Sequence, residues 1–446
     1  MTITRREMLA LAAAAVELRG KPSWDLPLVV VIGAAPARTP KGYRVIAIPP
    51  SGRAVFPPQG IAYRENAEAH QIWRQIHVAG PSLVVDAAGL TGLAAALEGK
   101  VPVVSTLPKN APEPSALSRI QAAQVARTPR ESAEQLGRTY GHVLPDVTYM
   151  LALPCMGRMR LGALADIEEL AAPYVDGRRD SLAKQDSTML PGHLLFADLY
   201  ERTKKRVYLD RLLAAANLGF AADGTPKESM PFHNEMSDSV FMGCPVLGQA
   251  ARLTGDPKYA AMAVRHLRFM EALGVRPDGL YRHSPLCEAA WGRGNAFPAL
   301  GLALLLESGV TDPHVVESFR KLLRALLPYQ DADGMWHQVV DRPDSYAEFT
   351  ATAMIAASLL KGMRGGWIER GIYEPAARRA WVAIQKRTAA DGVVMDVCES
   401  TGKQKSVENY LNRAAIWDRD PRGGAMAMLL ATEMFATEMM QGPLPA

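Results

Sequence analysis

An Asp-Gly pair recurs at a nearly regular interval from residue 176 onward, and this period constrains the fold more than any other feature. Successive pairs lie 47 to 58 residues apart. The pairs are Asp176-Gly177, Asp223-Gly224, Asp278-Gly279, Asp333-Gly334 and Asp391-Gly392. A period near 50 residues indicates one supersecondary unit that stacks against copies of itself. Propeller blades have a similar period but need four strands each, whereas these units have helical spacing, so we predict stacked helix hairpins.

Charge separates the helices of each hairpin into two kinds. One helix is nearly free of charge, and the segments of this kind are 239–251, 296–306, 349–360 and 425–435. The partner helices carry Arg, Lys and Glu on one face, as in 258–273, 313–327 and 374–386. A helix that is apolar all round is buried on all sides, whereas an amphipathic helix covers a surface. The pattern favours a mainly α fold, an (α/α) barrel of five or six hairpins over residues 131–446.

Residues 27–125 have a different pattern and predict a small α/β domain. Short β-branched runs at 27–32, 43–48, 82–85 and 101–105 alternate with helical segments, which is typical of a parallel sheet. Neither GxGxxG nor GxxxxGK[ST] occurs, so no phosphate-binding loop is indicated. The proline-rich stretch Pro108–Pro114 predicts a linker.

Composition excludes several classes of partner. The net charge of +4 over 446 residues, with no basic tract, argues against nucleic acid, and no apolar run reaches the roughly 18 residues of a membrane span. The four cysteines are far apart, so neither a metal nor a cofactor is predicted. Arg5-Arg6 before an apolar segment resembles a twin-arginine export signal within residues 1–20. We therefore expect a periplasmic or exported protein, with a cytoplasmic one as the alternative.

The segment after each Asp-Gly pair leads into the next charge-free helix, so the starts of these helices should surround one mouth of the barrel. Polar and aromatic residues gather at these starts, and the candidates are Asp186, Asp238, Trp291, Arg293, Asn295, Tyr346, Glu348 and Tyr410. Carboxylates, an arginine and aromatic rings suit a sugar acid, which needs an acid or base, a charge partner and a stacking face. For Asp238 alone, a helix N-cap is the competing interpretation.

Motifs in this order resemble a known family. They are Asp238–Pro245 (DSVFMGCP), Thr254-Gly255-Asp256, Trp291–Asn295 (WGRGN), Asp333–Gln338 (DGMWHQ), Tyr346–Met354 (YAEFTATAM) and Thr401-Gly402. Together they resemble the unsaturated glycuronyl and rhamnogalacturonyl hydrolases of glycoside hydrolase families 88 and 105, over about residues 140–440. The resemblance implies an (α/α)6 barrel that removes a 4,5-unsaturated uronic acid from oligosaccharides made by polysaccharide lyases.

The resemblance also implies roles for individual residues. Asp238 would protonate C4 of the double bond and then act as base for the water that adds at C5, after which the ring opens and the next sugar leaves. Asp186 resembles the second acid of the family. Because a free aspartic acid titrates near about pH 3.9, a proton donor of this kind needs burial or a second carboxylate nearby.

Further residues are matched to substrate contacts. Trp291 would stack on the unsaturated ring, Arg293 would hold its carboxylate, and His283 matches the histidine near the ring oxygens. His233 lies close to Asp238 in sequence, and Asn295, Tyr346, Glu348 and Tyr410 complete the predicted border. Two other functions remain open: a sugar epimerase, which would use histidines such as His283 and His337, and a glycan-binding protein without activity.

Overall fold

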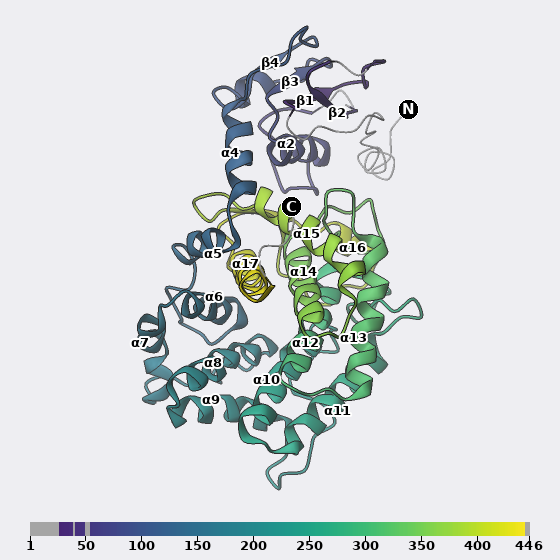
Figure 1. Ribbon diagram of the computed structural model, residues 1–446. Coiled ribbons are helices and arrows are strands. Elements are labelled where there is room, and N and C mark those ends of the chain that lie inside the picture. Colours follow the sequence, from purple (N-terminus) through teal and green to yellow (C-terminus); the bar gives the residue numbers. More distant parts are fainter. Residues whose placement is uncertain (1–25, 39–40, 50–53, 442–446) are drawn as a thin grey trace.

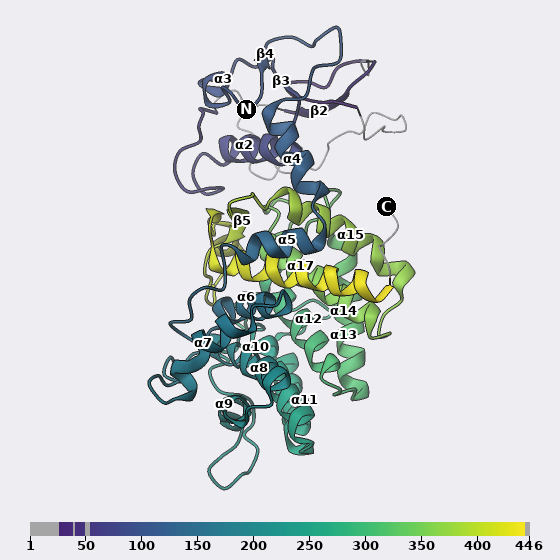
Figure 2. The same cartoon turned by 60° about the vertical axis from the view of Figure 1, so that its left-hand side comes forward.

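The computed structural model describes residues 26–38, 41–49 and 54–441, and it contains a small α/β domain and a large ring of helices (Figure 1). The α/β domain lies beside one part of the ring in both views (Figure 2). The predicted mainly helical fold class is confirmed. The predicted export signal in residues 1–20 lies outside the described residues.

The N-terminal domain is built on a four-stranded parallel sheet with the strand order β2-β1-β3-β4. Its strands are β1 (Leu28–Ile32), β2 (Arg44–Ile48), β3 (Leu83–Asp86) and β4 (Val103–Val104), and its helices are α2 (Ala67–Ala79), α3 (Leu93–Ala96) and α4 (Ala116–Ala126). The register pairs Val30 with Ile46 on one side and with Val84 on the other. β1 is buried along its whole length, which explains its unbroken apolar sequence.

The predicted linker Pro108–Pro114 does not join the α/β domain to the barrel. This stretch is a loop inside the α/β domain, between β4 and α4, and the Tyr43 hydroxyl donates to the Pro108 carbonyl at 2.8 Å. The chain instead passes to the barrel over Arg127 and Thr128, between α4 and α5 (Pro129–Gly137). A proline-rich composition marks irregular backbone, but it does not distinguish a linker from a loop fixed by tertiary contacts.

In the described part of the chain, six helices form an inner ring and six an outer ring. The inner helices are α6 (Tyr149–Arg160), α8 (Leu194–Thr203), α10 (Ser239–Thr254), α12 (Gly292–Glu307), α14 (Phe349–Arg364) and α17 (Pro421–Gln441). The outer helices are α5, α7 (Leu164–Val175), α9 (Arg206–Ala216), α11 (Pro257–Gly274), α13 (Pro313–Leu326) and α15 (Arg370–Lys386). This is an (α/α)6 barrel.

Burial separates the two rings as the charge pattern predicts. In α14 every residue from Phe349 to Gly362 is buried. In α13 only one stripe is buried, and it consists of Val315, Phe319, Leu322, Leu323 and Leu326. This spacing repeats with the period of a helix, so the apolar stripe faces the inner ring and the charged face lies outside.

The smaller elements lie between these helices. They are the short helix α16 (Val407–Leu411), the strands β5 (Val394–Cys398) and β6 (Ala415–Asp418), and the 3-10 turns η1 (Ser187–Met189), η2 (Pro191–His193), η3 (Asn217–Gly219) and η4 (Leu327–Tyr329). β5 and β6 form an antiparallel pair. Both belong to the long segment that precedes the last inner helix.

The repeated Asp-Gly pair forms the same turn in each hairpin. All five glycines are left-handed, with φ between 83° and 90°, a conformation in which glycine carries no steric penalty. In four of the five pairs the aspartate carboxylate accepts the backbone N–H two residues later, as an Asx-turn does; these are Asp176, Asp223, Asp278 and Asp391. The sequence period therefore reflects one repeated turn, which directs the chain from the end of each outer helix toward the mouth.

The ring closes where the last helix meets the first. α17 packs between α14 and α6, and α5 lies along the outer side of α17 (Figures 1 and 2). At the end opposite the mouth, Glu433 of α17 accepts hydrogen bonds of 2.8 Å from Lys361, Arg364 and Arg160. Glu307 bonds Lys361 and Arg364 as well. The cluster therefore joins α6, α12, α14 and α17 across the closure.

The charges of this cluster determine the protonation of Glu433. Burial by itself raises the pKa of the Glu433 carboxyl, but Lys361, Arg160 and Arg364 outweigh burial and hold the pKa well below its usual range. A carboxylate with a depressed pKa stabilises the fold above its unfolded pKa, and this contribution is lost as the pH falls below that value.

We predict that Glu433→Gln destabilises the protein by about 3–5 kcal/mol at pH 7, because it removes the buried carboxylate of the cluster and leaves Glu307 as the remaining acidic partner of Lys361 and Arg364. Denaturant unfolding measures the change. The difference between variant and wild type should shrink below roughly pH 4.3, where carboxylates begin to protonate in the unfolded chain. Glu134→Gln is the control, since its pair with Arg130 is exposed and worth at most about 1 kcal/mol. Equal stability of wild type and Glu433→Gln at pH 7 would contradict the assigned role.

Candidate active site

Asp238 stands at the start of α10, but it does not cap this helix. Its backbone is helical (φ −48°, ψ −30°) and its side chain accepts no capping hydrogen bond. The side chain is 13% exposed, and its buried Oδ1 atom has no hydrogen-bond partner. The N-cap interpretation of Asp238 is therefore wrong, because an N-cap has extended backbone and an occupied carboxylate. A buried polar atom without a partner is rare and calls for a functional explanation.

His283 faces this carboxylate. Its Nε2 lies 3.3 Å from Asp238 Oδ1, within ion-pair distance but off the line of a hydrogen bond, so neither atom has a hydrogen-bond partner. The backbone holds the two residues together, because the Ser237 N–H donates to the His283 carbonyl at 2.9 Å. The Ser237 hydroxyl also donates to the Gly294 carbonyl at 2.6 Å, which ties the start of α10 to α12.

Tyr410 lies on the other side of the imidazole. Its hydroxyl is 2.7 Å from His283 Nδ1 and accepts the Gln404 N–H at 3.2 Å. Burial raises the pKa of the Tyr410 hydroxyl, so it keeps its proton. With that proton directed at Nδ1, the neutral imidazole carries its own proton on Nε2, on the side of Asp238; this tautomer is inferred from the hydrogen-bond network. The three side chains form a line from Tyr410 through His283 to Asp238.

Trp291 packs against the same histidine. The ring centroids of Trp291 and His283 are 4.4 Å apart. The indole is 1% exposed, and its Nε1 is buried without a hydrogen-bond partner. Asp238, His283 and Trp291 thus contribute three unpartnered polar atoms to one neighbourhood, and each such atom costs about 1–3 kcal/mol when left unpaired. The concentration of this cost at one place indicates a site built for a ligand or a reacting group.

Arg293 is buried beneath this neighbourhood rather than exposed at the mouth. It is 3% exposed, and its terminal nitrogens donate to the carbonyls of Cys398 (2.7 Å) and Glu399 (2.8 Å). Its guanidinium carbon lies 4.6 Å from the centroid of the Trp291 ring. This geometry gives Arg293 a structural role in holding β5 and Trp291, and its contact with a substrate carboxylate stays a prediction.

Glu348 caps an inner helix with its carboxylate, whereas Asp238 does not. It precedes α14 with extended backbone, and its oxygens accept the N–H groups of Ala351 (2.5 Å) and Cys398 (2.9 Å) and the Thr350 hydroxyl. It is fully buried, and Arg293 lies 4.0 Å away. Its environment is therefore that of a structural cap beneath the site.

Asn295 and Tyr346 are buried as well. The Asn295 amide donates to the carbonyls of Tyr281 and Trp291 and accepts the Tyr281 N–H, so its polar atoms serve the backbone. The Tyr346 ring stacks on Tyr63 of the N-terminal domain at a centroid distance of 4.8 Å. Tyr63 is not among the site residues predicted from the sequence, because no sequence pattern connects positions 63 and 346.

Asp186 lies on a neighbouring element of the mouth. It caps η1, where its carboxylate accepts the Thr188 N–H at 2.8 Å, and η1 packs against α10. Its side chain is 40% exposed, with Lys184 Nζ at 3.7 Å. Asp186 thus differs from Asp238, because its carboxylate is exposed to solvent and already accepts a hydrogen bond. A placement of the two carboxylates on opposite sides of one cavity stays a prediction.

An open hollow of about 450 Å³ borders the start of α10. It is lined by the segment Ser229–Glu235 and by Lys403, whose Nζ lies 3.0 Å from a Glu235 oxygen. His233 is part of this wall, and its carbonyl accepts the Ser239 hydroxyl at 3.0 Å. Phe232, Asn234 and Glu235 are left-handed, with φ of 65°, 47° and 55°. Backbone strain of this kind concentrates at binding and catalytic sites.

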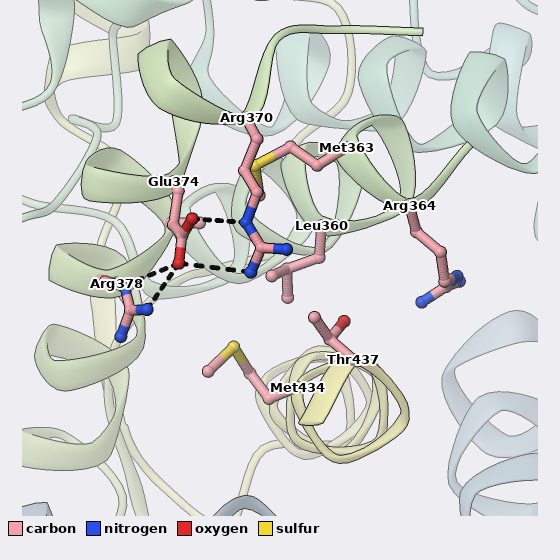
Figure 3. A pocket seen from close by; sticks show the side chains of 9 residues that line it. Leu360, Met363, Arg364, Arg370, Glu374, Arg378, Met434 and Thr437 are labelled. Atoms are coloured by element: carbon pink, nitrogen blue, oxygen red, sulfur yellow. Dashed lines mark hydrogen bonds and ion pairs between the residues drawn. The ribbon is translucent and has the colours of Figure 1, made fainter. Parts of the chain in front are cut away.

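A second cavity lies near the opposite ends of α14 and α17 and cannot hold a sugar. Its volume is about 10 Å³, room for about one water molecule. Figure 3 shows that Arg370 and Arg378 both bond Glu374 at its border, while Met434 and Thr437 face it from α17. Among the described residues, no group of three or more His, Cys, Asp or Glu side chains could hold a metal ion, and no helix is long and apolar enough to cross a membrane.

Residues 167–438 match the sequence model of Glycosyl Hydrolase Family 88, which is more than half of the chain. This chain belongs to glycosyl hydrolase family 88. The matched region begins in α7 and runs into α17, so it covers most of the barrel and leaves out the N-terminal α/β domain.

Curated relatives and solved structures agree with this assignment. The unsaturated rhamnogalacturonyl hydrolase YesR of Bacillus subtilis (strain 168) is 35% identical over 124 residues, 27% of this chain and 34% of that protein. An unsaturated 3S-rhamnoglycuronyl hydrolase of Formosa agariphila is 28% identical over 182 residues, 35% of this chain and 48% of that protein. The aligned part of this family 88 chain therefore spans about a third to a half of these relatives.

The fold is shared with structures of low sequence identity. A family 88 glycosyl hydrolase from Bacteroides vulgatus has a TM-score of 0.58 at 17% identity and covers 70% of this chain and 100% of that one. The unsaturated glucuronyl hydrolase from Bacillus sp. GL1 has a TM-score of 0.52 at 17% identity, over 73% and 97% of the two chains. The N-terminal domain is thus an addition to a barrel that these enzymes share.

The two mouth carboxylates predict opposite effects on stability. Asp238→Asn should leave the thermal midpoint unchanged or raise it, because the carboxylate has no hydrogen bond to lose. Glu348→Ala should lower the stability by about 2 kcal/mol or more, because it removes a cap and leaves buried N–H groups unpaired. Thermal unfolding of both variants beside the wild type checks this, and an unfolded Asp238→Asn variant would restore the capping interpretation.

Proposed function

We propose that this chain is an unsaturated glycuronyl hydrolase, which removes a 4,5-unsaturated uronic acid from the end of oligosaccharides that polysaccharide lyases produce. The observation that carries this proposal is the buried Asp238 oxygen without a hydrogen-bond partner, 3.3 Å from the equally unpartnered His283 Nε2. Membership of family 88 and the activities for which the relatives are named support the same reaction class.

In this proposal Asp238 begins the reaction as a neutral acid. Its proton passes to C4 of the vinyl ether, and the positive charge that develops at C5 is shared with the ring oxygen. The carboxylate then takes a proton from the water that attacks C5. The resulting hemiketal collapses, the ring opens and the next sugar leaves with a hydroxyl group, so that one water molecule is consumed. A carboxyl group held in position at the reacting carbon is suited to such a proton transfer.

His283 and Tyr410 support this chemistry by position. With the Tyr410 proton directed at Nδ1, the Nε2 proton of His283 points toward the side on which Asp238 lies. It can donate to the carboxylate once that group has lost its proton, and a hydrogen bond to the charged form stabilises it. Asp186, hydrated and near Lys184, is assigned to binding or polarising the sugar hydroxyls rather than to proton donation.

The two alternatives are not favoured. A sugar epimerase would use a second histidine, but His337 is bonded to the Ser345 carbonyl (2.6 Å) and to Asp331 (3.2 Å), a structural arrangement. A glycan-binding protein without activity would have no need of a buried, unpartnered carboxylate, whose desolvation is costly.

We predict activity on unsaturated disaccharides that end in a 4,5-unsaturated uronic acid. The assay measures the loss of ultraviolet absorbance as the double bond is consumed. Asp238→Asn should lower kcat by roughly 10²–10⁴-fold, the usual contribution of a positioned acid-base group. Asp186→Asn should act mainly on KM, because its carboxylate is expected to contact the sugar.

The matched control is Asp180→Asn, an exposed aspartate of the loop before Asp186, which should leave kcat and KM unchanged. If folded wild type leaves the absorbance of both glucuronyl and galacturonyl substrates intact, or if Asp238→Asn keeps full activity, the proposed function is wrong.

A further inference from the structure

The N-terminal α/β domain lies outside the matched family region, yet it is joined to the barrel beside the site. Figure 2 shows it above β5, α5 and α15, on the part of the ring where β5 and β6 precede the last inner helix. Side-chain amides of α4 reach this part of the barrel, since Gln124 donates to the Thr388 carbonyl at 3.0 Å. This contact docks the domain at the end of α15 and involves neither Asp396 nor the residues around Asp238.

A second set of contacts reaches the mouth itself through Arg74 of α2. Arg74 is buried, pairs with Asp396 of β5 and donates to the Ala415 carbonyl of β6 at 3.0 Å. Its guanidinium carbon lies 5.0 Å from the centroid of the Tyr63 ring and 5.6 Å from that of Trp417. The arginine is thus enclosed by barrel and domain together, so the pair forms only when the two are docked.

Asp396 is strained where it receives Arg74. Its φ is 68°, at the irregularity of β5 between Met395 and Val397. A non-glycine residue in the left-handed region costs about 1–3 kcal/mol and persists only when its surroundings impose it. The carboxylate also accepts the Tyr63 hydroxyl at 3.3 Å and lies 3.4 Å from Arg387. The N-terminal domain thus supplies two of the three groups that keep Asp396 in this conformation.

The strand leads directly to the floor of the site. Two residues after Asp396, the Cys398 carbonyl accepts Arg293 at 2.7 Å, and the Cys398 N–H donates to Glu348 at 2.9 Å. Arg293 in turn lies against the ring of Trp291. The position of β5 therefore sets the position of the indole that packs on His283.

Tyr63 acts on the same wall directly. Its ring is stacked on Tyr346 with an angle of 10° between the planes. Ala62 beside it belongs to one buried cluster with Trp291, Tyr346 and Tyr410, and Tyr63 packs against that cluster. The loop of the α/β domain thus supplies part of the aromatic wall behind three predicted substrate residues.

We propose that the N-terminal α/β domain is a fixed component of the active site, in which Tyr63 and Arg74 are positioning residues for the buried aromatic cluster of Trp291 and Tyr346 that supports the sugar site from behind. This inference rests on the proposed function. The domain acts on the shape of the sugar site through this cluster, whereas proton transfer by Asp238 is left to the barrel.

The test compares Tyr63→Ala with Tyr63→Phe in the full chain, using an unsaturated uronyl disaccharide. Tyr63→Ala removes the ring behind Tyr346 and should raise KM by about tenfold, the effect of one aromatic contact, while kcat changes less than about twofold. Tyr63→Phe keeps the ring and loses the 3.3 Å bond to Asp396, which Arg74 and Arg387 still hold, so its KM should stay close to the wild-type value. Arg74→Met should raise KM in the same direction as Tyr63→Ala.

Gln124→Ala is the matched interface control, because it removes a docking hydrogen bond that involves neither Asp396 nor the aromatic cluster, and it should leave KM unchanged even where the melting temperature falls. A purely structural role of Tyr63 predicts a lower melting temperature with an unchanged KM in Tyr63→Ala, and this result would overturn the inference while leaving the proposed function intact. Absence of activity in the wild type would overturn both. A Tyr63→Ala variant that does not fold is replaced by Tyr63→Leu, for which the same rise in KM is expected.

Discussion

Closure of the inner ring is the constraint on which the rest of the structure depends. Helices such as α12 and α14 are buried on every side, so they have no stable surface except one another and the outer helices. The ring is complete only when α17 reaches α6, and the two are joined by the Glu433 cluster as well as by packing. This joint lies where α6, α12 and α14 end, so the opposite ends of the helices are left to form the mouth.

The end of the barrel that holds the Glu433 cluster is rigid, and this rigidity permits buried polar groups without hydrogen-bond partners at the mouth. The carboxylates Glu307 and Glu433 of the cluster are both paired with cations, whereas the Asp238 carboxylate at the mouth has a buried oxygen without a hydrogen-bond partner. The rings of His283 and Trp291 each have a buried nitrogen without one. Left-handed non-glycine residues also gather near the mouth, at Gln185 before Asp186, at Phe232, Asn234 and Glu235 beside the hollow, and at Asp396. Costs of this kind persist only where the surrounding structure imposes them, and the closed ring supplies that support.

Much of the fold was predictable because its signals are local. The Asp-Gly pairs mark turns whose glycines all need positive φ, and the absence of charge marks helices that are buried all round. The candidate site was predictable only as a set of positions. Arg293 and Asn295 lie at the start of an inner helix as predicted, but both are buried and donate to backbone carbonyls. Asp238 and Glu348 both precede an inner helix, and only backbone angles and distant partners reveal that one caps it and the other does not.

The contribution of the N-terminal domain could not be predicted, because it depends on contacts between residues 322 positions apart in sequence, such as Arg74 and Asp396. Their effect on the site passes through one strand. The desolvation of an arginine buried between two domains is offset by a carboxylate beside it, and Asp396 supplies this carboxylate at the irregularity of β5. The position of β5 fixes the carbonyls that hold Arg293, and Arg293 supports the indole beside His283. The N-terminal domain, which lies outside the matched family region, can thus influence the site without contacting the reacting atoms. It does so through β5, which holds Arg74 at Asp396 and Arg293 at Cys398.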